Sequence, residues 1–265
     1  MSSKPTIVLI HGLWMTPKSW DTWAERFRAA GHDVIVPGWP GVGDRTPQDI
    51  RRDPSALEGI GIKDVVDHYD AIIRALPEQP IIMGHSFGGL FAQLLADRGL
   101  GRAIVGVTPG QPAGIPTLPL NTLRSGLPVL SNPFKKNGAS PISKRHFHFT
   151  FGNDLTRAQS DVIWEEQAIN SVNRVFFEGA LSALNKNGPS RVDFAKADRA
   201  PMLILTGSID HVVPPAIGQA IVAKYSGPAT VDYREFAGRT HRIVSQDGWE
   251  EVADYALTWA LEHSK

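Results

Sequence analysis

Short apolar segments alternate with amphipathic segments along most of this 265-residue chain. Six runs rich in apolar or β-branched residues have the length of strands: Thr6–Ile10, Asp33–Pro37, Pro80–Met83, Ala103–Thr108, Met202–Thr206 and Thr230–Phe236. Five segments between and after them have helical patterns: Ser19–Ala30, Ile62–Leu76, Leu90–Asp97, Pro215–Tyr225 and Asp247–His263. This alternation is typical of βαβ units. We therefore predict an α/β fold with about six mainly parallel strands flanked by helices.

The pattern changes between Pro109 and about Arg191. This stretch has no run that reads as a buried strand, and Pro, Asn, Lys and aromatic residues are frequent in it. Two helices are predicted there, over Thr156–Ile169 and Val172–Leu184. We interpret residues 110–191 as a mostly helical insertion in a core formed by residues 1–109 and 192–265.

Charge and composition exclude several classes of protein. The formal net charge is zero, which argues against nucleic acid or an anionic membrane as the main partner. The densest basic pairs are Lys135-Lys136 and Lys144-Arg145. The chain has no cysteine, so disulfides and thiolate metal sites are excluded. No signal peptide is visible and no apolar stretch approaches the ~20 residues of a membrane span, so we expect a cytoplasmic protein.

The most informative motif is Gly84-His85-Ser86-Phe87-Gly88-Gly89, which follows an apolar run and opens a helix. A serine with a glycine two positions away on each side, between a strand and a helix, is the pattern of a nucleophile elbow. Glycine avoids a collision in so tight a turn. The free amides at a helix N-terminus also favour negative charge beside the serine. We predict that Ser86 is a nucleophile.

A serine hydroxyl needs a base within hydrogen-bond reach, and that base needs an acceptor that fixes its tautomer. His241 follows the last predicted strand, and Asp210 follows the strand Met202–Thr206. Ligands of parallel sheets bind at the carboxyl ends of the strands, where these loops begin. We therefore predict that Ser86, His241 and Asp210 meet at that edge.

An oxyanion hole needs backbone N–H groups already in place. One donor is predicted at Phe87, directly after the serine. The second is predicted at Leu13, in the loop after the first strand, where Gly12 lets the backbone approach closely.

Together these motifs resemble the α/β-hydrolase superfamily, and most closely its small bacterial cap-bearing carboxylesterases and lipase-like serine hydrolases. The matching positions are His11-Gly12, Pro37–Gly43, Gly84–Gly89, Gly207-x-x-Asp210-x-x-Val213-Pro214 and His241. The chain order of serine, acid and histidine is also that of the superfamily. The resemblance implies an α/β-hydrolase fold with a helical cap at residues 110–191. Members often begin with two extra strands, and we expect the sheet here to be without them, because Thr6 already lies in the strand before the oxyanion loop.

The resemblance also implies a serine esterase that needs no cofactor or metal and takes a small-molecule ester. Haloalkane dehalogenases and epoxide hydrolases have Asp at the position of Ser86, so neither activity is expected here. Plant hydroxynitrile lyases have Thr at the position of Gly12 and Lys at the position of Arg242, so a lyase activity is not expected either. Hydrolysis of another acyl bond (amide, thioester or C–C), cofactor-free perhydrolysis, and a non-catalytic ligand-binding role stay open as alternatives.

Candidate substrate contacts are Gly12, Trp14, His85 and Trp164. Further aromatic residues of the insertion either line the pocket or form the core of the insertion itself: Phe147, Phe149, Phe151, Phe176 and Phe177. The sequence indicates neither the substrate nor the oligomeric state.

Overall fold

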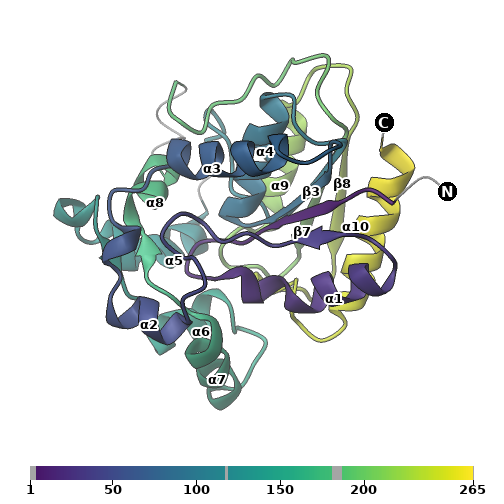
Figure 1. Cartoon of the computed structure of the whole chain (residues 1–265). Coiled ribbons are helices and arrows are strands. Elements are labelled where there is room, and N and C mark those ends of the chain that lie inside the picture. The colour runs from purple at the N-terminus through teal and green to yellow at the C-terminus, as the bar shows by residue number, and fades with distance from the viewer. Residues whose placement is uncertain (1–3, 117–118, 181–186, 265) are drawn as a thin grey trace.

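The structure, a computed structural model, describes residues 4–116, 119–180 and 187–264. Its main sheet has six strands, all parallel, in the order β2-β1-β3-β4-β7-β8. They are β1 (Ile7–Ile10), β2 (Val34–Ile35), β3 (Ile81–His85), β4 (Ala103–Val107), β7 (Met202–Gly207) and β8 (Val231–Phe236). The predicted α/β fold, with mainly parallel strands flanked by helices, is confirmed (Figure 1).

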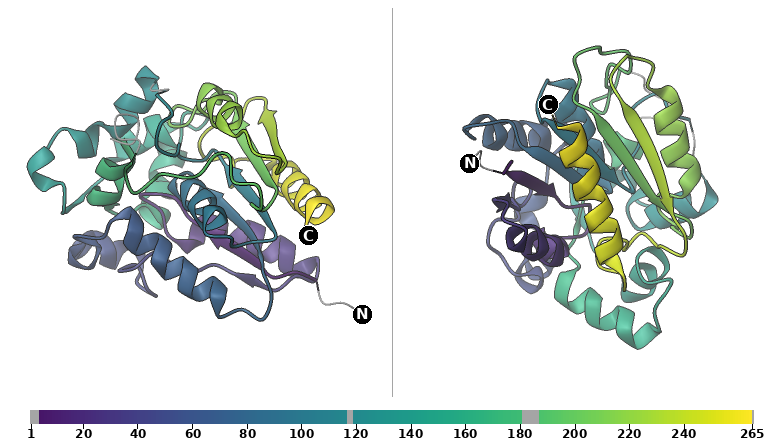
Figure 2. Two further views of the ribbon diagram at one scale, coloured as in Figure 1. Left: turned by 90° about the horizontal axis from the view of Figure 1, so that it is seen from above. Right: turned by 90° about the vertical axis from the view of Figure 1, so that its right-hand side faces the viewer.

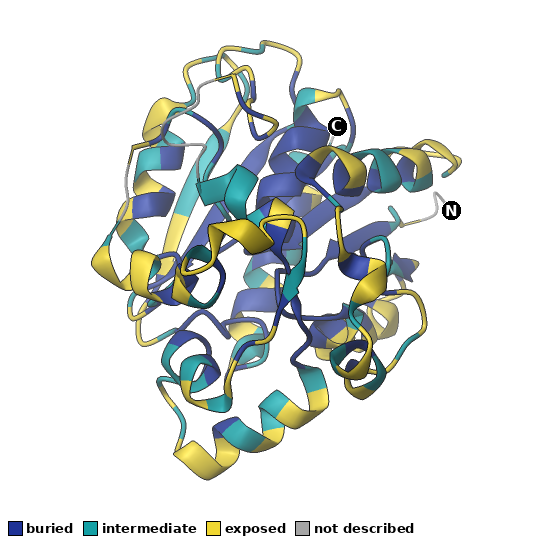
Figure 3. Cartoon of the chain, turned by 90° about the vertical axis from the view of Figure 1, so that its left-hand side faces the viewer, coloured by how far each residue is buried: buried dark blue, intermediate teal, exposed yellow. Residues whose placement is uncertain are grey.

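Helices cover both faces of this sheet. Helices α1 (Asp21–Ala29) and α10 (Trp249–His263) pack on one face, and the right-hand view of Figure 2 shows α10 lying across it. Helices α3 (Ile62–Arg74), α4 (Phe87–Asp97) and α9 (Pro215–Lys224) pack on the other. Successive side chains of a strand point to opposite faces, so each central strand contributes to both cores. Figure 3 shows the strands buried at the centre and the outer helix faces exposed.

The strand register brings the predicted catalytic loops to one edge. Ile10 of β1 pairs with Gly84 of β3, and Gly207 of β7 pairs with Phe236 of β8. These residues are the last or nearly the last of their strands. The chain therefore leaves the same edge of the sheet toward each of the predicted loops.

The segment between β4 and β7 contains α5 (Leu120–Leu130), α6 (Lys144–Thr150), α7 (Arg157–Gln167) and α8 (Asn173–Ala180). The last two agree with the predicted helices, apart from residues 181–184, which lie outside the described residues. Helices α5 and α6 were not predicted. The segment also contains two short strands that were not predicted, β5 (Ala139–Ser140) and β6 (Ser171–Val172), which form a small antiparallel pair.

Local chemistry explains the other differences. Thr46 caps α2 (Pro47–Arg52), a short helix within the loop that follows β2, by accepting a hydrogen bond from the Asp49 amide. Helix α10 begins two residues later than predicted, because Gly248 adopts a left-handed conformation with φ of 79° directly before it. Among the described residues, no helix has the length and apolar character needed to cross a membrane.

Candidate active site

Ser86 lies in a strained turn between β3 and α4. Its φ of 55° and ψ of −121° are unusual for a residue with a side chain. A Cβ at Gly84 would lie 2.1 Å from the Gly88 carbonyl oxygen, and a Cβ at Gly88 would lie 2.1 Å from that of Ile10. Only glycine fits at these two positions without a backbone shift. The sequence motif therefore has the steric basis that an elbow requires.

His241 and Asp210 form a buried pair. The Nδ1 atom of His241 lies 2.8 Å from an Asp210 carboxylate oxygen, and both side chains are fully buried. The other carboxylate oxygen accepts hydrogen bonds from the Val212 and Val213 amides, at 2.7 and 2.9 Å. Because a carboxylate only accepts, it fixes the proton on Nδ1 and leaves the lone pair on Nε2.

The Nε2 atom of His241 is buried and has no hydrogen-bond partner among the described residues. Ser86 is 7% exposed, and the structure shows no hydrogen bond between its hydroxyl and His241. The structure thus joins the predicted acid to the predicted base, but it does not join the base to the serine.

Two hydrogen bonds between backbone groups join the acid loop to the strand and loop that precede His241. The Ser208 amide donates to the Phe236 carbonyl and the Ile209 amide donates to the Arg239 carbonyl, both at 3.0 Å. Gly207 allows this approach, since a Cβ there would lie 2.4 Å from the Arg239 carbonyl oxygen. The backbone therefore holds Asp210 at its distance from His241.

His85 links the elbow to the histidine loop. Its Nε2 lies 2.8 Å from the His241 carbonyl oxygen, and the two rings are 4.7 Å apart. Burial lowers the pKa of His85 well below its usual value, so the ring is neutral and donates the Nε2 proton to that carbonyl. Nothing in the motif itself indicated this contact.

The loop after β1 lies directly against the elbow. A Cβ at Gly12 would be 2.8 Å from the Ser86 Cβ. Trp14 adopts a φ of 64°, and its carbonyl accepts a hydrogen bond of 2.9 Å from the Ile169 amide. Among the described residues, the amides of Leu13 and Phe87 have no hydrogen-bond acceptor. Both donors remain available to a ligand.

His11 fixes the start of this loop. Its Nδ1 donates to the Gly12 carbonyl at 2.9 Å, while its Nε2 accepts from the Trp39 amide at 3.2 Å. The Trp39 indole donates in turn to the His11 carbonyl. Burial lowers the pKa of His11 to about 4, so the ring is neutral near pH 7 and makes both bonds.

Ser86 borders a cavity of about 290 Å³. The lining residues come from the core and from α5 and α8: Trp14, Ser86, Phe87, Leu90, Gly110, Gln111, Thr122, Leu123, Ser125, Gly126, Leu130, Phe176, Gly179, Ala180, Val212, Val213 and Ile217. None of these residues is charged. The α5 residues were missed because that helix was not predicted, although its leucines recur at helical spacing.

The predicted substrate contacts divide into two groups. Trp14 and Phe176 line the cavity, whereas Gly12, His85 and Trp164 are not among its lining residues. The Trp164 indole instead donates to the Ile142 carbonyl at 2.7 Å. Phe147, Phe149, Phe151 and Phe177 also lie outside the lining, and Phe147 and Phe151 are buried in a stacked pair.

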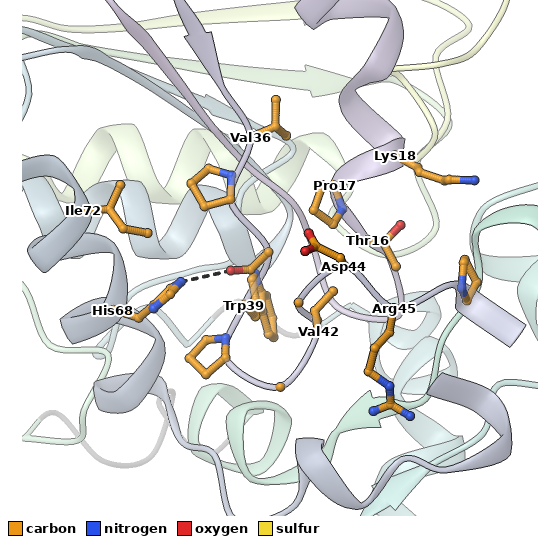
Figure 4. Close-up of a pocket in the computed structure, with 16 residues that line it drawn as sticks. Thr16, Pro17, Lys18, Val36, Trp39, Val42, Asp44, Arg45, His68 and Ile72 are labelled. Carbon is orange, nitrogen blue, oxygen red and sulfur yellow. Dashed lines mark hydrogen bonds between the residues drawn. The ribbon is translucent and has the colours of Figure 1, made fainter. Parts of the chain in front are cut away.

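A larger hollow of about 580 Å³ lies beside the loop after β2 (Figure 4). Its labelled residues include Lys18, Trp39, Asp44 and Arg45, and His68 bonds to the Gly38 carbonyl at 3.1 Å. None of the predicted catalytic residues lines this hollow. Size alone would therefore point to the wrong place, and the smaller cavity is the candidate active site.

Comparison with known proteins identifies proteins that are similar to this chain. A curated relative from Cupriavidus pinatubonensis, a 2-hydroxy-6-oxononadienedioate/2-hydroxy-6-oxononatrienedioate hydrolase, is 24% identical over 224 residues, which cover 82% of this chain and 75% of the relative. Two solved structures are similar over almost their whole length. The monoacylglycerol lipase of Paleococcus ferrophilus has a TM-score of 0.67 and 20% identity, covering 98% of this chain and 95% of its own. An extracellular alpha/beta-hydrolase from a Paenibacillus species has a TM-score of 0.72 and 19% identity, with coverage of 97% and 99%.

The family model of the alpha/beta hydrolases matches residues 7–255, nearly the whole sequence. This match spans both parts of the predicted core and the segment between them. Membership supports a hydrolase activity. The chain belongs to the alpha/beta hydrolase family.

Proposed function

We propose that this protein hydrolyses neutral carboxylic esters through an acyl-enzyme on Ser86. One observation carries the proposal: His241 and Asp210 form a fully buried pair whose second imidazole nitrogen has no partner among the described residues. His85 joins the loop of His241 to the strained turn of Ser86, which borders a cavity whose described lining is uncharged. A buried imidazole whose tautomer is fixed by a carboxylate is suited to act as a general base.

In the proposed reaction, the Ser86 oxygen attacks the ester carbonyl carbon while His241 Nε2 takes the hydroxyl proton. The carbonyl oxygen becomes an oxyanion that accepts hydrogen bonds from the amides of Leu13 and Phe87. The C–O bond to the alcohol then breaks, and His241 returns the proton to the leaving oxygen. A water molecule deprotonated by His241 attacks the acyl group next, releasing the acid and restoring Ser86.

The hydrogen bond from Ser86 to His241 has to form when substrate binds. Catalytic hydrogen bonds are often long or poorly aligned in a free enzyme and tighten in the substrate complex. Asp210 stabilises the imidazolium that results.

The lining of the cavity favours an uncharged substrate. The name of the Cupriavidus relative describes a dicarboxylate substrate. A dicarboxylate needs cationic partners, and none of the described residues that line this cavity is Lys or Arg. Hydrolysis of the C–C bond of such a substrate is therefore less well supported here than ester hydrolysis. We further propose that residues 110–191 act as a cap, because α5 and α8 supply part of the lining.

The test compares Ser86→Ala with the wild type on p-nitrophenyl acetate and butyrate and on matched amide and thioester substrates. We expect Ser86→Ala to abolish ester hydrolysis and labelling by a fluorophosphonate probe. The control is Ser226→Ala, an exposed serine, which should leave both unchanged. Ordinary turnover by Ser86→Ala would refute the assignment. If the wild type turned over the amide or the thioester faster than the ester, the proposed substrate class would change to that compound.

A further inference from the structure

Helix α5 exposes apolar side chains to solvent. Leu120 is 84% exposed, Leu127 54% and Leu123 37%, and Phe134, just past the helix, is 98% exposed. Seven large hydrophobic side chains are exposed in the part of the chain that the structure describes, and these four fall within fifteen consecutive residues. Single exposed apolar residues are ordinary, but a cluster indicates an interaction surface.

The three leucines form one face of the helix, and Phe134 follows in the next turn of the chain. An α-helix turns about 100° per residue, so Leu120, Leu123 and Leu127 fall within an arc of about 60°. The opposite side of α5 is buried through Ser125, Gly126 and Val129, among others. We call Leu120, Leu123, Leu127 and Phe134 the apolar face of α5.

The apolar face of α5 is continuous with the candidate active site. Leu123 belongs to the apolar face and also lines the cavity that contains Ser86. Thr122, Gly126 and Leu130 line the cavity from the same helix. An apolar molecule that reached Leu123 from outside would therefore already be at the border of the site.

The segment of the chain that carries this face is one-sided in charge. Between Asp97 and Asp154 the chain has no acidic residue and seven Lys or Arg residues, although the whole chain has 27 of each sign. Lys135 and Lys136 directly follow Phe134, are exposed, and form no ion pair with any described residue. The zero net charge, from which we expected no anionic membrane as main partner, hides this asymmetry.

We propose that the apolar face of α5, together with Lys135 and Lys136, docks on the surface of an anionic phospholipid bilayer. The leucines and Phe134 enter the boundary between headgroups and acyl chains, and the lysines bind the anionic headgroups. An ester dissolved in that bilayer then enters the cavity past Leu123. The docking does not depend on the proposed chemistry of Ser86, but the route of entry does.

The test measures binding of the full chain to vesicles, using Ser86→Ala so that no lipid is consumed. Vesicles of phosphatidylglycerol and phosphatidylcholine are compared with vesicles of phosphatidylcholine alone, by flotation at low and high salt. We expect binding to the anionic vesicles that weakens with salt. Lys135→Gln with Lys136→Gln should lower the partition coefficient about 25-fold, since each lysine near an anionic surface contributes about fivefold.

In the same background, Leu127→Ser should lower the partition coefficient about tenfold. The matched control is Leu261→Ser, a leucine 42% exposed on α10, which should bind like its parent. Absence of vesicle binding, equal binding to both lipids, or equal losses from Leu127→Ser and Leu261→Ser would each overturn the proposal. If Leu127→Ser failed to fold, the lysine pair would still decide. A dimer that Leu127→Ser dissolves, without vesicle binding, would assign the face to self-association instead.

Discussion

Replacing Asp210 by Asn tests the proposed mechanism most directly, because the surroundings of the carboxylate dictate how an amide must sit. One oxygen of Asp210 accepts from the Val212 and Val213 amides, and the other accepts from His241 Nδ1. In Asp210→Asn the amide oxygen stays where two N–H donors already point, because the opposite orientation would place its NH₂ group against them. The NH₂ group therefore faces His241.

This orientation changes the tautomer of the base. An NH₂ group only donates, so His241 Nδ1 has to accept and the ring proton moves to Nε2. An imidazole protonated on Nε2 cannot take the Ser86 proton. We expect kcat for p-nitrophenyl butyrate to fall about 10⁴-fold, which corresponds to a barrier higher by about 5 kcal/mol. The shape of the side chain is kept, so the loops themselves should keep their fold.

The assay is steady-state hydrolysis by Asp210→Asn, His241→Ala and the double variant, together with thermal unfolding of each. The double variant should be no slower than His241→Ala alone, because groups that act as one unit are not additive. The control is Asp161→Asn, which removes a partly exposed carboxylate paired with Arg157 and should leave kcat unchanged. If folded Asp210→Asn retains more than a tenth of wild-type activity, the tautomer argument is wrong.

Three further predictions concern the loops around Ser86. Gly12→Ala puts a Cβ 2.8 Å from the Ser86 Cβ, so the loop after β1 has to move and one oxyanion donor is misplaced. We expect kcat for p-nitrophenyl butyrate to fall about 10²- to 10³-fold, and unchanged turnover would contradict this. Gly88→Ala forces a Cβ to 2.1 Å from the Ile10 carbonyl oxygen and should lower the free energy of unfolding, measured in urea, by more than about 3 kcal/mol. In the control Gly110→Ala the nearest neighbour of the Cβ is at 3.4 Å, so the loss should be less than about 1 kcal/mol. Equal losses would refute the steric argument. Because the pKa of His11 is about 4 when folded and 6.5 when unfolded, the unfolded state binds more protons between these values. The contribution of His11 to the free energy of unfolding is therefore fully present above pH 6.5 and falls by about 3 kcal/mol as the pH is lowered to 4. Urea titrations at several pH values measure this slope, and His11→Gln should make it shallower.

The sequence was sufficient to predict the elements that depend on local signals. Except for β8, each strand of the main sheet is a short apolar run bounded by Gly, Pro or polar residues, a pattern consistent with a buried strand. The positions of Ser86, Asp210 and His241 followed, since each comes soon after a predicted strand. The roles of these three residues stay predictions.

Two features could not be predicted for physical reasons. Helix α5 contains Gly126 and Pro128, which have the lowest intrinsic helix propensities, and packing against the rest of the protein overrides them. The hydrogen bond from His85 to the His241 carbonyl joins residues 156 positions apart. A contact of that range follows only from the complete fold, and no local pattern specifies it.

The hydrogen bond from the Ile169 amide to the Trp14 carbonyl has a consequence for engineering new specificities. Trp14 is the residue after Leu13, so the loop expected to hold the developing negative charge is tethered to the segment between β4 and β7. A mutation that changes the backbone of this segment near Ile169 therefore also displaces the loop that contains Leu13 and Trp14. Libraries confined to residues 110–191 should alter turnover number and apparent affinity together, and variants that gain a new substrate will need compensating changes near Trp14 to regain speed.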